Sequence, residues 1–144
     1  MKKTKKVLLV ALMLLGTMMC FAQETANSVI VKVTGIEEMK GEISIGLFSD
    51  EENYPNGDVF AGTFVKADNE TITYTFENIP EGVFAIAIYH DENSNKKHDK
   101  NFLGIPKEGY AFSNNVFGTF GPPKFEKTKF EVKEDIQLEI KLKY

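Results

Sequence analysis

Apolar and polar residues alternate along several short segments of the chain. The clearest are residues 28–34, where three valines share one face, and residues 71–76, where threonines alternate with Ile72, Tyr74 and Phe76. Because successive side chains of a strand point to opposite faces, this period of two predicts strands with one buried face. Further strands are expected at residues 42–47, 60–66, 83–89, 110–117, 129–133 and 136–143.

Turn-forming residues between these segments suggest how the strands pair. The stretch 37–41 predicts a hairpin between residues 28–34 and 42–47, and Glu134-Asp135 predicts a second hairpin at the C-terminus. Residues 83–89 are apolar on both faces, as expected for a central strand covered on each side. No long stretch has the apolar period of a helix, so the sequence predicts an all-β fold, a single antiparallel β-sandwich of about seven to eight strands.

The N-terminal segment has the pattern of an export signal. Four lysines among the first six residues precede the uncharged run 7–20, which is too short to anchor stably across a bilayer. Small residues at Cys20 and Ala22 predict cleavage after Ala22, giving a signal peptide at 1–22 and a β-sandwich domain at 23–144. Acylation of Cys20 is the alternative, although Met19 is not the small residue that usually precedes a lipidated cysteine.

Signal cleavage sets the compartment and the charge. We expect an exported protein, periplasmic, secreted or associated with the cell envelope, with no transmembrane anchor after cleavage. The only cysteine is lost, so the mature chain has no disulfide. Of 17 basic residues, all lysine, 17 − 4 = 13 remain against 21 acidic ones, a net charge of about −8. This charge argues against nucleic acid as a partner.

A long segment at residues 91–126 separates the central strand from the C-terminal strands. Connections in compact domains are usually much shorter, so this segment is expected to have a function. Four glycines supply turning points, and the aromatic content argues for an ordered loop folded back over the sandwich. The aromatic residues are Phe102, Tyr110, Phe112, Phe117, Phe120 and Phe125.

The first part of this loop has the oxygen spacing of a calcium loop. Positions one, three, five and nine are taken by Asp91, Asn93, Asn95 and Asp99. The match is partial, because an EF-hand has glycine where this chain has Lys96 and glutamate where it has Phe102. The alternative is a metal-free turn in which the Asp and Asn side chains bond their own backbone. No cofactor is required, and calcium is the candidate ion.

The chemistry of the loop favours binding over catalysis. His90 and His98 flank the calcium-like stretch, but two histidines alone are weak evidence for a metal or acid/base site, and no catalytic residue is assigned. We expect a non-enzymatic binding or scaffold module for an unknown ligand or cell-envelope partner, with an aromatic surface or a small loop core. The binding candidates are Phe102, Glu108, Tyr110 and Phe112. The alternative is a periplasmic hydrolase of glycans or peptides that uses the carboxylates of Asp91, Glu92, Asp99 and Glu108.

The same loop carries a family resemblance. The runs 90–95, Asp99, 101–115, 121–123 and Phe125 resemble a bacterial family of small exported proteins known as domain of unknown function 2141. That family usually has glycines where this chain has Ser94 and Lys96, which implies a less flexible loop here. The run 79–84 is similar to the start of a strand in transthyretin-like sandwiches. The resemblance implies a transthyretin-like, or prealbumin-like, fold, with an immunoglobulin-like sandwich as the alternative, and it implies no activity.

Overall fold

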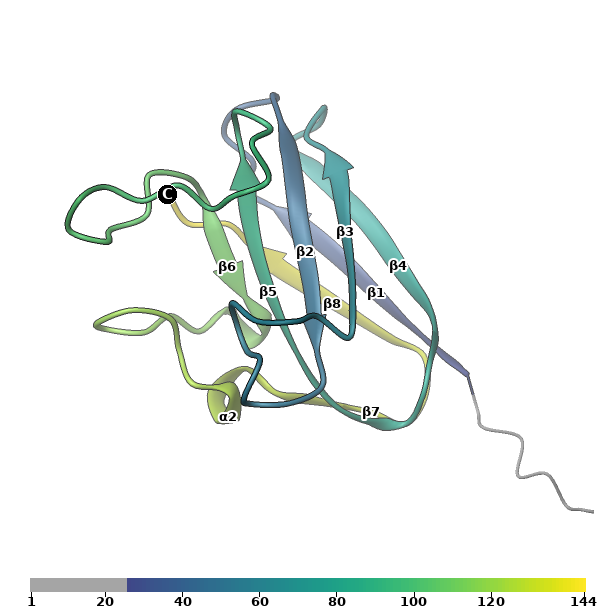
Figure 1. Cartoon of the computed structure of the whole chain (residues 1–144). Helices are drawn as coiled ribbons and strands as arrows, with labels where there is room; N and C mark the ends of the chain where they lie inside the picture. The colour runs from purple at the N-terminus through teal and green to yellow at the C-terminus, as the bar shows by residue number, and fades with distance from the viewer. Residues whose placement is uncertain (1–25) are drawn as a thin grey trace, which may run out of the picture.

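The computed structural model describes residues 26–144, so the expected signal peptide at 1–22 and Cys20 lie outside it. Two β-sheets stack face to face around one core (Figure 1). The first sheet has the order β4-β1-β8, from β1 (Asn27–Thr34), β4 (Thr71–Ile79) and β8 (Ile136–Lys141). The second has the order β3-β2-β5-β6, with β7 also paired to β5, from β2 (Glu42–Phe48), β3 (Ala61–Lys66), β5 (Gly82–Asp91), β6 (Tyr110–Phe112) and β7 (Phe130–Val132). The predicted all-β sandwich is confirmed.

Both predicted hairpins are wrong. Strands β1 and β2 lie in different sheets, because the turn between them carries the chain across the sandwich. Likewise, β7 pairs with β5 while β8 crosses to the other sheet and pairs with β1. The β1–β8 pair is parallel, whereas the sequence predicted a wholly antiparallel sandwich. A period of two indicates which side chains are buried but not which strand is the neighbour, and this is the reason for both errors.

The main core lies where the two sheets face each other. The valines of β1 are fully buried, as are Ile43, Ile45 and Leu47 of β2, and each set occupies every second position. On the other side of β1, Lys32 pairs with Glu139 of β8 at the surface. Fully burying a branched aliphatic side chain stabilises a fold by about 1.5–3 kcal/mol, so these two rows fix both the packing and the strand faces.

Strand β5 is covered on both faces, as its apolar sequence predicts. Phe84, Ile86 and Ile88 belong to the main core, whereas Ala85 and Ala87 face a second, smaller core. This second core is built from the long segment after β5 and the loop after β2. Its members are Phe48, Tyr54, Ala85, Phe112 and Phe125, with Ala87, Tyr110 and Phe117 packed against them. The long segment therefore forms a third layer on the outer face of the second sheet.

The strand expected at residues 110–117 is much shorter in the structure. After β6 the chain enters a 3-10 turn, η1 (Ser113–Asn115), in which Asn114 and Asn115 have positive φ angles of 63° and 52°. Asparagine tolerates this conformation better than most residues, which explains why the strand ends here. Asn115 also exchanges two hydrogen bonds with β8, from its side-chain amide to the Glu139 carbonyl and from the Lys141 amide to its side-chain oxygen. One short helix, α2 (Phe125–Thr128), follows.

Candidate functional site

Two loops project from the β6 side of the sandwich in the same direction (Figure 1). We call residues 100–107 the first projection and residues 117–123 the second projection. At their apices the apolar side chains are in solvent: Phe102 is 94% exposed, Leu103 68% and Ile105 55%, and Phe120 is fully exposed. Large apolar side chains gathered at loop tips are unusual on a surface, so these tips are the candidate contact surface.

The first projection is a tight turn that holds its apolar residues in place. The Asn101 side-chain oxygen accepts hydrogen bonds from the amides of Leu103 (2.9 Å) and Ile105 (3.0 Å). The Asn101 amide donates to the Ile105 carbonyl at 2.8 Å, and Gly104 takes a φ of 78° at the apex, where a side chain would be strained. The backbone is thus satisfied locally, and the apolar side chains of Phe102, Leu103 and Ile105 are left to point outward.

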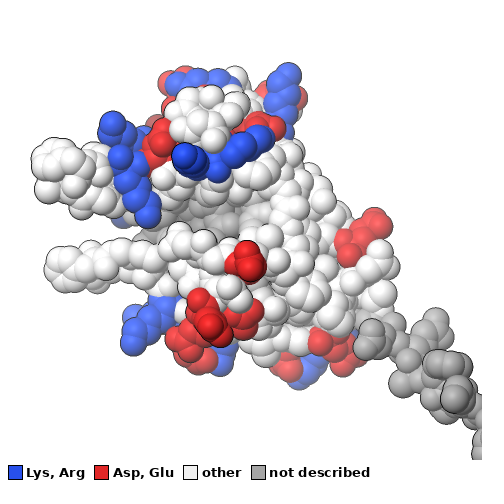
Figure 2. Space-filling view, viewed as in Figure 1, with Lys and Arg blue, Asp and Glu red and all other residues white. Residues whose placement is uncertain are grey.

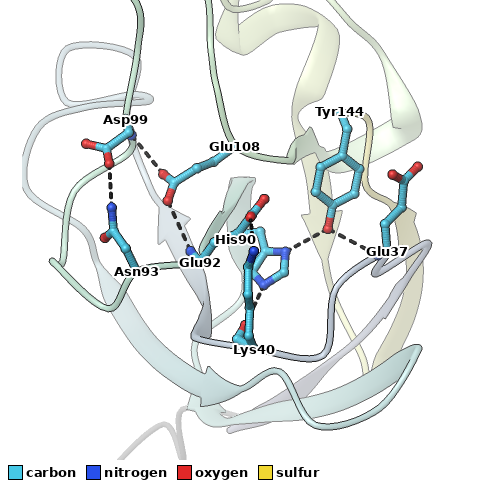
Figure 3. Close-up of polar contacts among 8 residues, drawn as sticks. All are labelled: Glu37, Lys40, His90, Glu92, Asn93, Asp99, Glu108 and Tyr144. Carbon is cyan, nitrogen blue, oxygen red and sulfur yellow. Dashed lines mark hydrogen bonds and ion pairs between the residues drawn. The ribbon is translucent and has the colours of Figure 1, made fainter.

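Glu108 joins the two ends of the loop below the first projection. The residue is 5% exposed, and its carboxylate accepts hydrogen bonds from the Glu92 amide at 3.0 Å and the Asp99 amide at 2.8 Å (Figure 3). A hydrogen bond to a charged acceptor contributes more than a neutral one, about 1.5–3 kcal/mol. Glu108 therefore supports the first projection from below rather than presenting its carboxylate to solvent.

The calcium-like stretch forms a compact Asx-rich turn. Asp91 is fully buried, and its two oxygens accept the amides of Asn95 (2.9 Å) and Lys96 (2.7 Å). The oxygen of Asn93 accepts the Asn95 amide at 3.0 Å, and one Asp99 oxygen accepts both side-chain amides, from Asn93 (2.7 Å) and Asn95 (3.0 Å). All four predicted ligands lie together, but N–H donors engage an oxygen of each. These bonds lower the pKa of Asp99.

His90 belongs to a network that fixes the C-terminus against the sheet. Its Nε2 lies 2.7 Å from the Lys40 carbonyl oxygen, which can only accept, so Nε2 carries the proton. Nδ1 lies 2.7 Å from the Tyr144 hydroxyl, from which it accepts when the ring is neutral, and that hydroxyl in turn accepts from the Glu37 amide at 3.3 Å (Figure 3). Both ring nitrogens of the fully buried His90 are occupied within the chain, which is the arrangement of a structural histidine.

His98 is held between two tyrosine rings. It stacks on Tyr89 with ring centroids 5.4 Å apart and lies 5.9 Å from the ring of Tyr110. Burial is the main cause that lowers the pKa of His98, and its Nε2 has no hydrogen-bond partner among residues 26–144. The ring is therefore neutral at pH 7 and packs as an aromatic side chain.

The second projection stands on the aromatic core of the third layer. The ring of Phe117 packs edge-on against Tyr110 with centroids 5.7 Å apart, which joins the base of this projection to β6. Gly118 closes the loop: a Cβ there would lie 2.1 Å from the Gly121 carbonyl oxygen, so no larger residue fits. On the other side, the Asn114 amide donates to the carbonyls of Lys127 and Lys129, each at 3.1 Å. Phe120 is thus displayed by a supported turn.

The four predicted binding residues do not share one surface. Phe102 lies at the apex of the first projection, whereas Glu108 and Phe112 are buried and Tyr110 is half-buried in the aromatic core. Sequence reasoning missed Leu103, Ile105 and Phe120 as exposed apolar residues. The residues on either side of these apolar side chains could have indicated their exposure. Turn patterns are present there, Asn101-x-x-Gly104 and Gly118-x-x-Gly121, and a turn offers the apolar residues within it no strand or helix in which to be buried.

The carboxylates of the hydrolase alternative are engaged by other groups of the chain. Asp91 and Glu108 are engaged by backbone amides, and Glu92 pairs with Lys40 at 3.1 Å. An open groove runs between β8, the C-terminus and η1, and its acidic lining residues are Glu37 and Glu139, not these four. Within residues 26–144, no three His, Cys, Asp or Glu side chains cluster as metal ligands, and no helix is long and apolar enough to cross a membrane.

The geometry defines a class of protein: a two-sheet β-sandwich with a third layer that displays two apolar loop tips. Residues 31–140 match the family described as uncharacterized protein conserved in bacteria (DUF2141). The chain belongs to this family, as the resemblance of its loop indicates. Neither the curated proteins nor the solved structures include a match to the chain. The transthyretin-like and immunoglobulin-like assignments therefore stay predictions.

Proposed function

We propose that this protein is an exported, non-enzymatic binding module of the cell envelope whose contact surface is the pair of apolar projections. The observation that carries the proposal is the exposure of Phe102 and Phe120 at two separate loop tips. Fully burying each of these side chains is favourable by about 1.5–3 kcal/mol, so the two together supply roughly 3–6 kcal/mol, which is enough for a weak affinity.

The hydrogen bonds that order the two projections support a binding role for their exposed side chains. Asn101 orders the first turn, Glu108 clamps its base, and Asn114 ties down the segment before the second projection. A contact surface that is ordered before binding loses less conformational entropy when the partner arrives. A loop of this length without a binding function would not need buried polar groups to order it, because exposed loops tolerate mobility.

Sedimentation with envelope material tests the proposal. Protein expressed without residues 1–22 is mixed with washed envelopes of a bacterium that lacks the gene, and the bound fraction is measured after centrifugation. We expect the wild type to sediment with the envelopes and the double variant Phe102→Ser/Phe120→Ser to stay in the supernatant. The matched control is Met39→Ser, which removes an apolar side chain that is 53% exposed in the β1–β2 turn.

Because the substituted side chains are in solvent, the variants are expected to keep the melting temperature of the wild type. Wild-type protein that stays in the supernatant would contradict the proposal. Equal sedimentation of the wild type and the double variant would contradict it as well, since the contact would then lie elsewhere on the molecule.

A further inference from the structure

The two projections differ from the rest of the molecule in charge as well as in polarity. Residues 100–107 and 117–124 hold three lysines and no acidic residue, although acidic residues outnumber lysines over the whole chain. The acidic side chains next to the first projection, Asp99 and Glu108, accept hydrogen bonds within the loop. The projections that carry the apolar tips are therefore locally basic on an acidic protein.

The lysines stand where the projections leave the body of the molecule. Lys100 and Lys107 are the two ends of the first projection, and Lys124 directly follows the second; all three are exposed. Lys96 instead pairs with Glu42 and lies over the Phe64 ring, away from the tips. Figure 2 shows lysine side chains beside the base of the upper projection, while the ends of both projections are uncharged. Each projection thus has an apolar apex and a cationic base.

We propose, resting on the function proposed above, that the partner of the two projections is the surface of an anionic phospholipid bilayer. Single apolar side chains on separate tips suit a soft apolar phase, which closes around each of them without a matching pocket. A protein partner would need shaped cavities for both tips. When the apices enter the acyl region, Lys100, Lys107 and Lys124 lie at the level of the headgroup phosphates, where lysine is attracted by anionic lipid.

The orientation that follows keeps the acidic body away from the lipid. The projections point from the β6 side of the sandwich, and they extend beyond the body in Figures 1 and 2. A flat membrane surface that touches both tips then lies close to few carboxylates. Binding therefore meets little repulsion between these carboxylates and the negative lipids. Binding is consequently expected to weaken as salt screens the lysines, while the apolar insertion remains.

Vesicles without protein test the inference. Protein lacking residues 1–22 is sedimented with vesicles of phosphatidylethanolamine and phosphatidylglycerol, and separately with vesicles of phosphatidylcholine. We expect binding to the anionic vesicles and little binding to the neutral ones. Phe102→Ser/Phe120→Ser is expected to weaken the affinity by at least about tenfold, because two apolar insertions are lost. Met39→Ser should bind as the wild type does.

A second pair of double variants tests the role of the lysines at the base of the first projection. Lys100→Gln/Lys107→Gln is expected to reduce binding to the anionic vesicles by about tenfold at low salt and to flatten its salt dependence. Lys66→Gln/Lys133→Gln, which removes the same charge from β3 and from the turn after β7, should leave both unchanged. Equal losses in the two double variants would show a net-charge effect and would overturn the inference.

Three other results would also overturn it: no binding to anionic vesicles, equal binding to neutral vesicles, or unchanged binding by the phenylalanine double variant. Sedimentation velocity adds a further check, because a dimer that the phenylalanine double variant abolishes would make a second copy of the chain the partner. Binding to envelopes without binding to vesicles overturns the lipid partner but leaves the proposed function intact. Failure to bind either one overturns both proposals.

Discussion

At the residue scale, the polar side chains of the long loop act on the backbone. The buried carboxylate of Asp91 accepts two amides, and Asn93, Asn95 and Asn101 each accept at least one amide from residues that follow them. Asparagine and aspartate do this commonly, because their short side chains reach the backbone two residues ahead. The sequence predicted a metal-free turn at Asp91, Asn93 and Asn95 as one alternative, but the same spacing is compatible with a calcium loop, so spacing alone could not choose between the two.

His98 gives a prediction for the pH dependence of stability. Its pKa is lowered in the folded state by burial, so the unfolded chain takes up a proton at a higher pH than the native one. Stability should therefore be lost as the pH falls below about 6.5, the ordinary value for histidine, toward the lowered pKa of the folded state. His98→Phe keeps a ring between Tyr89 and Tyr110 but does not titrate.

Thermal melts at neutral pH and at mildly acidic pH measure this effect. On acidification, the melting temperature of the wild type is expected to fall further than that of His98→Phe. Protonation of the carboxylates contributes equally to the decrease in both proteins. Equal losses in the two proteins would show that His98 is freely protonated in the native state, contrary to its position between the tyrosine rings.

At the element scale, the first projection depends on Glu108. Glu108→Gln keeps the shape but replaces one of two acceptor oxygens with an amide, which must then face the Glu92 or the Asp99 N–H. We expect the free energy of unfolding to fall by about 1–3 kcal/mol, since a buried donor is left unpaired. Amide hydrogen exchange should accelerate most in residues 92–99, because the clamp closes that loop.

The control for this change is Glu126→Gln, which removes an exposed carboxylate of α2 that pairs with Lys129 just after the helix. An exposed ion pair contributes little, so this variant should unfold and exchange as the wild type does. Uniform acceleration of exchange across both sheets in Glu108→Gln would argue that the glutamate supports the whole domain and not the loop.

The strands also show the limit of prediction at this scale. The faces of β1, β2 and β4 were predictable, because alternate positions such as Val31, Ile45 and Ile72 are buried. Their partners were not, because turns that cross between sheets can have the same length and composition as hairpin turns. The turn at Glu134-Asp135 joins β7 and β8, which belong to different sheets, and the parallel β1–β8 pair has no local sequence signal at all.

At the scale of the whole molecule, calcium is expected to have no effect on stability. An ion that binds only the native state must raise the melting temperature. In the Asx turn the predicted ligands Asp91, Asn93, Asn95 and Asp99 already accept hydrogen bonds, so an ion would compete with these N–H donors for the same side chains. Thermal unfolding with millimolar calcium and with chelator should give the same curve. A clear rise with calcium, absent in Asp91→Asn, would instead establish the calcium loop.

The candidate surface was only partly predictable from the sequence. The aromatic load of residues 91–126 correctly indicated an ordered loop packed on the sandwich, and Phe112, Phe117 and Phe125 do form its core. The sequence did not distinguish these rings from Phe102 and Phe120, which are exposed. All five lie in similar glycine-containing stretches, and the side that each faces is set by the three-dimensional path of the loop.

Tryptophan fluorescence can show directly whether the two apices leave water on binding, because the chain has no tryptophan of its own. Phe102→Trp and Phe120→Trp each place one fluorescent indole at the apex of a projection, and Met39→Trp places one on the exposed β1–β2 turn as a control. On mixing with bacterial envelopes, we predict that the emission of both apex variants shifts to shorter wavelength as the indole leaves water, while the control does not change. Emission from the two apex variants that stays at the wavelength of a water-exposed indole would contradict the account.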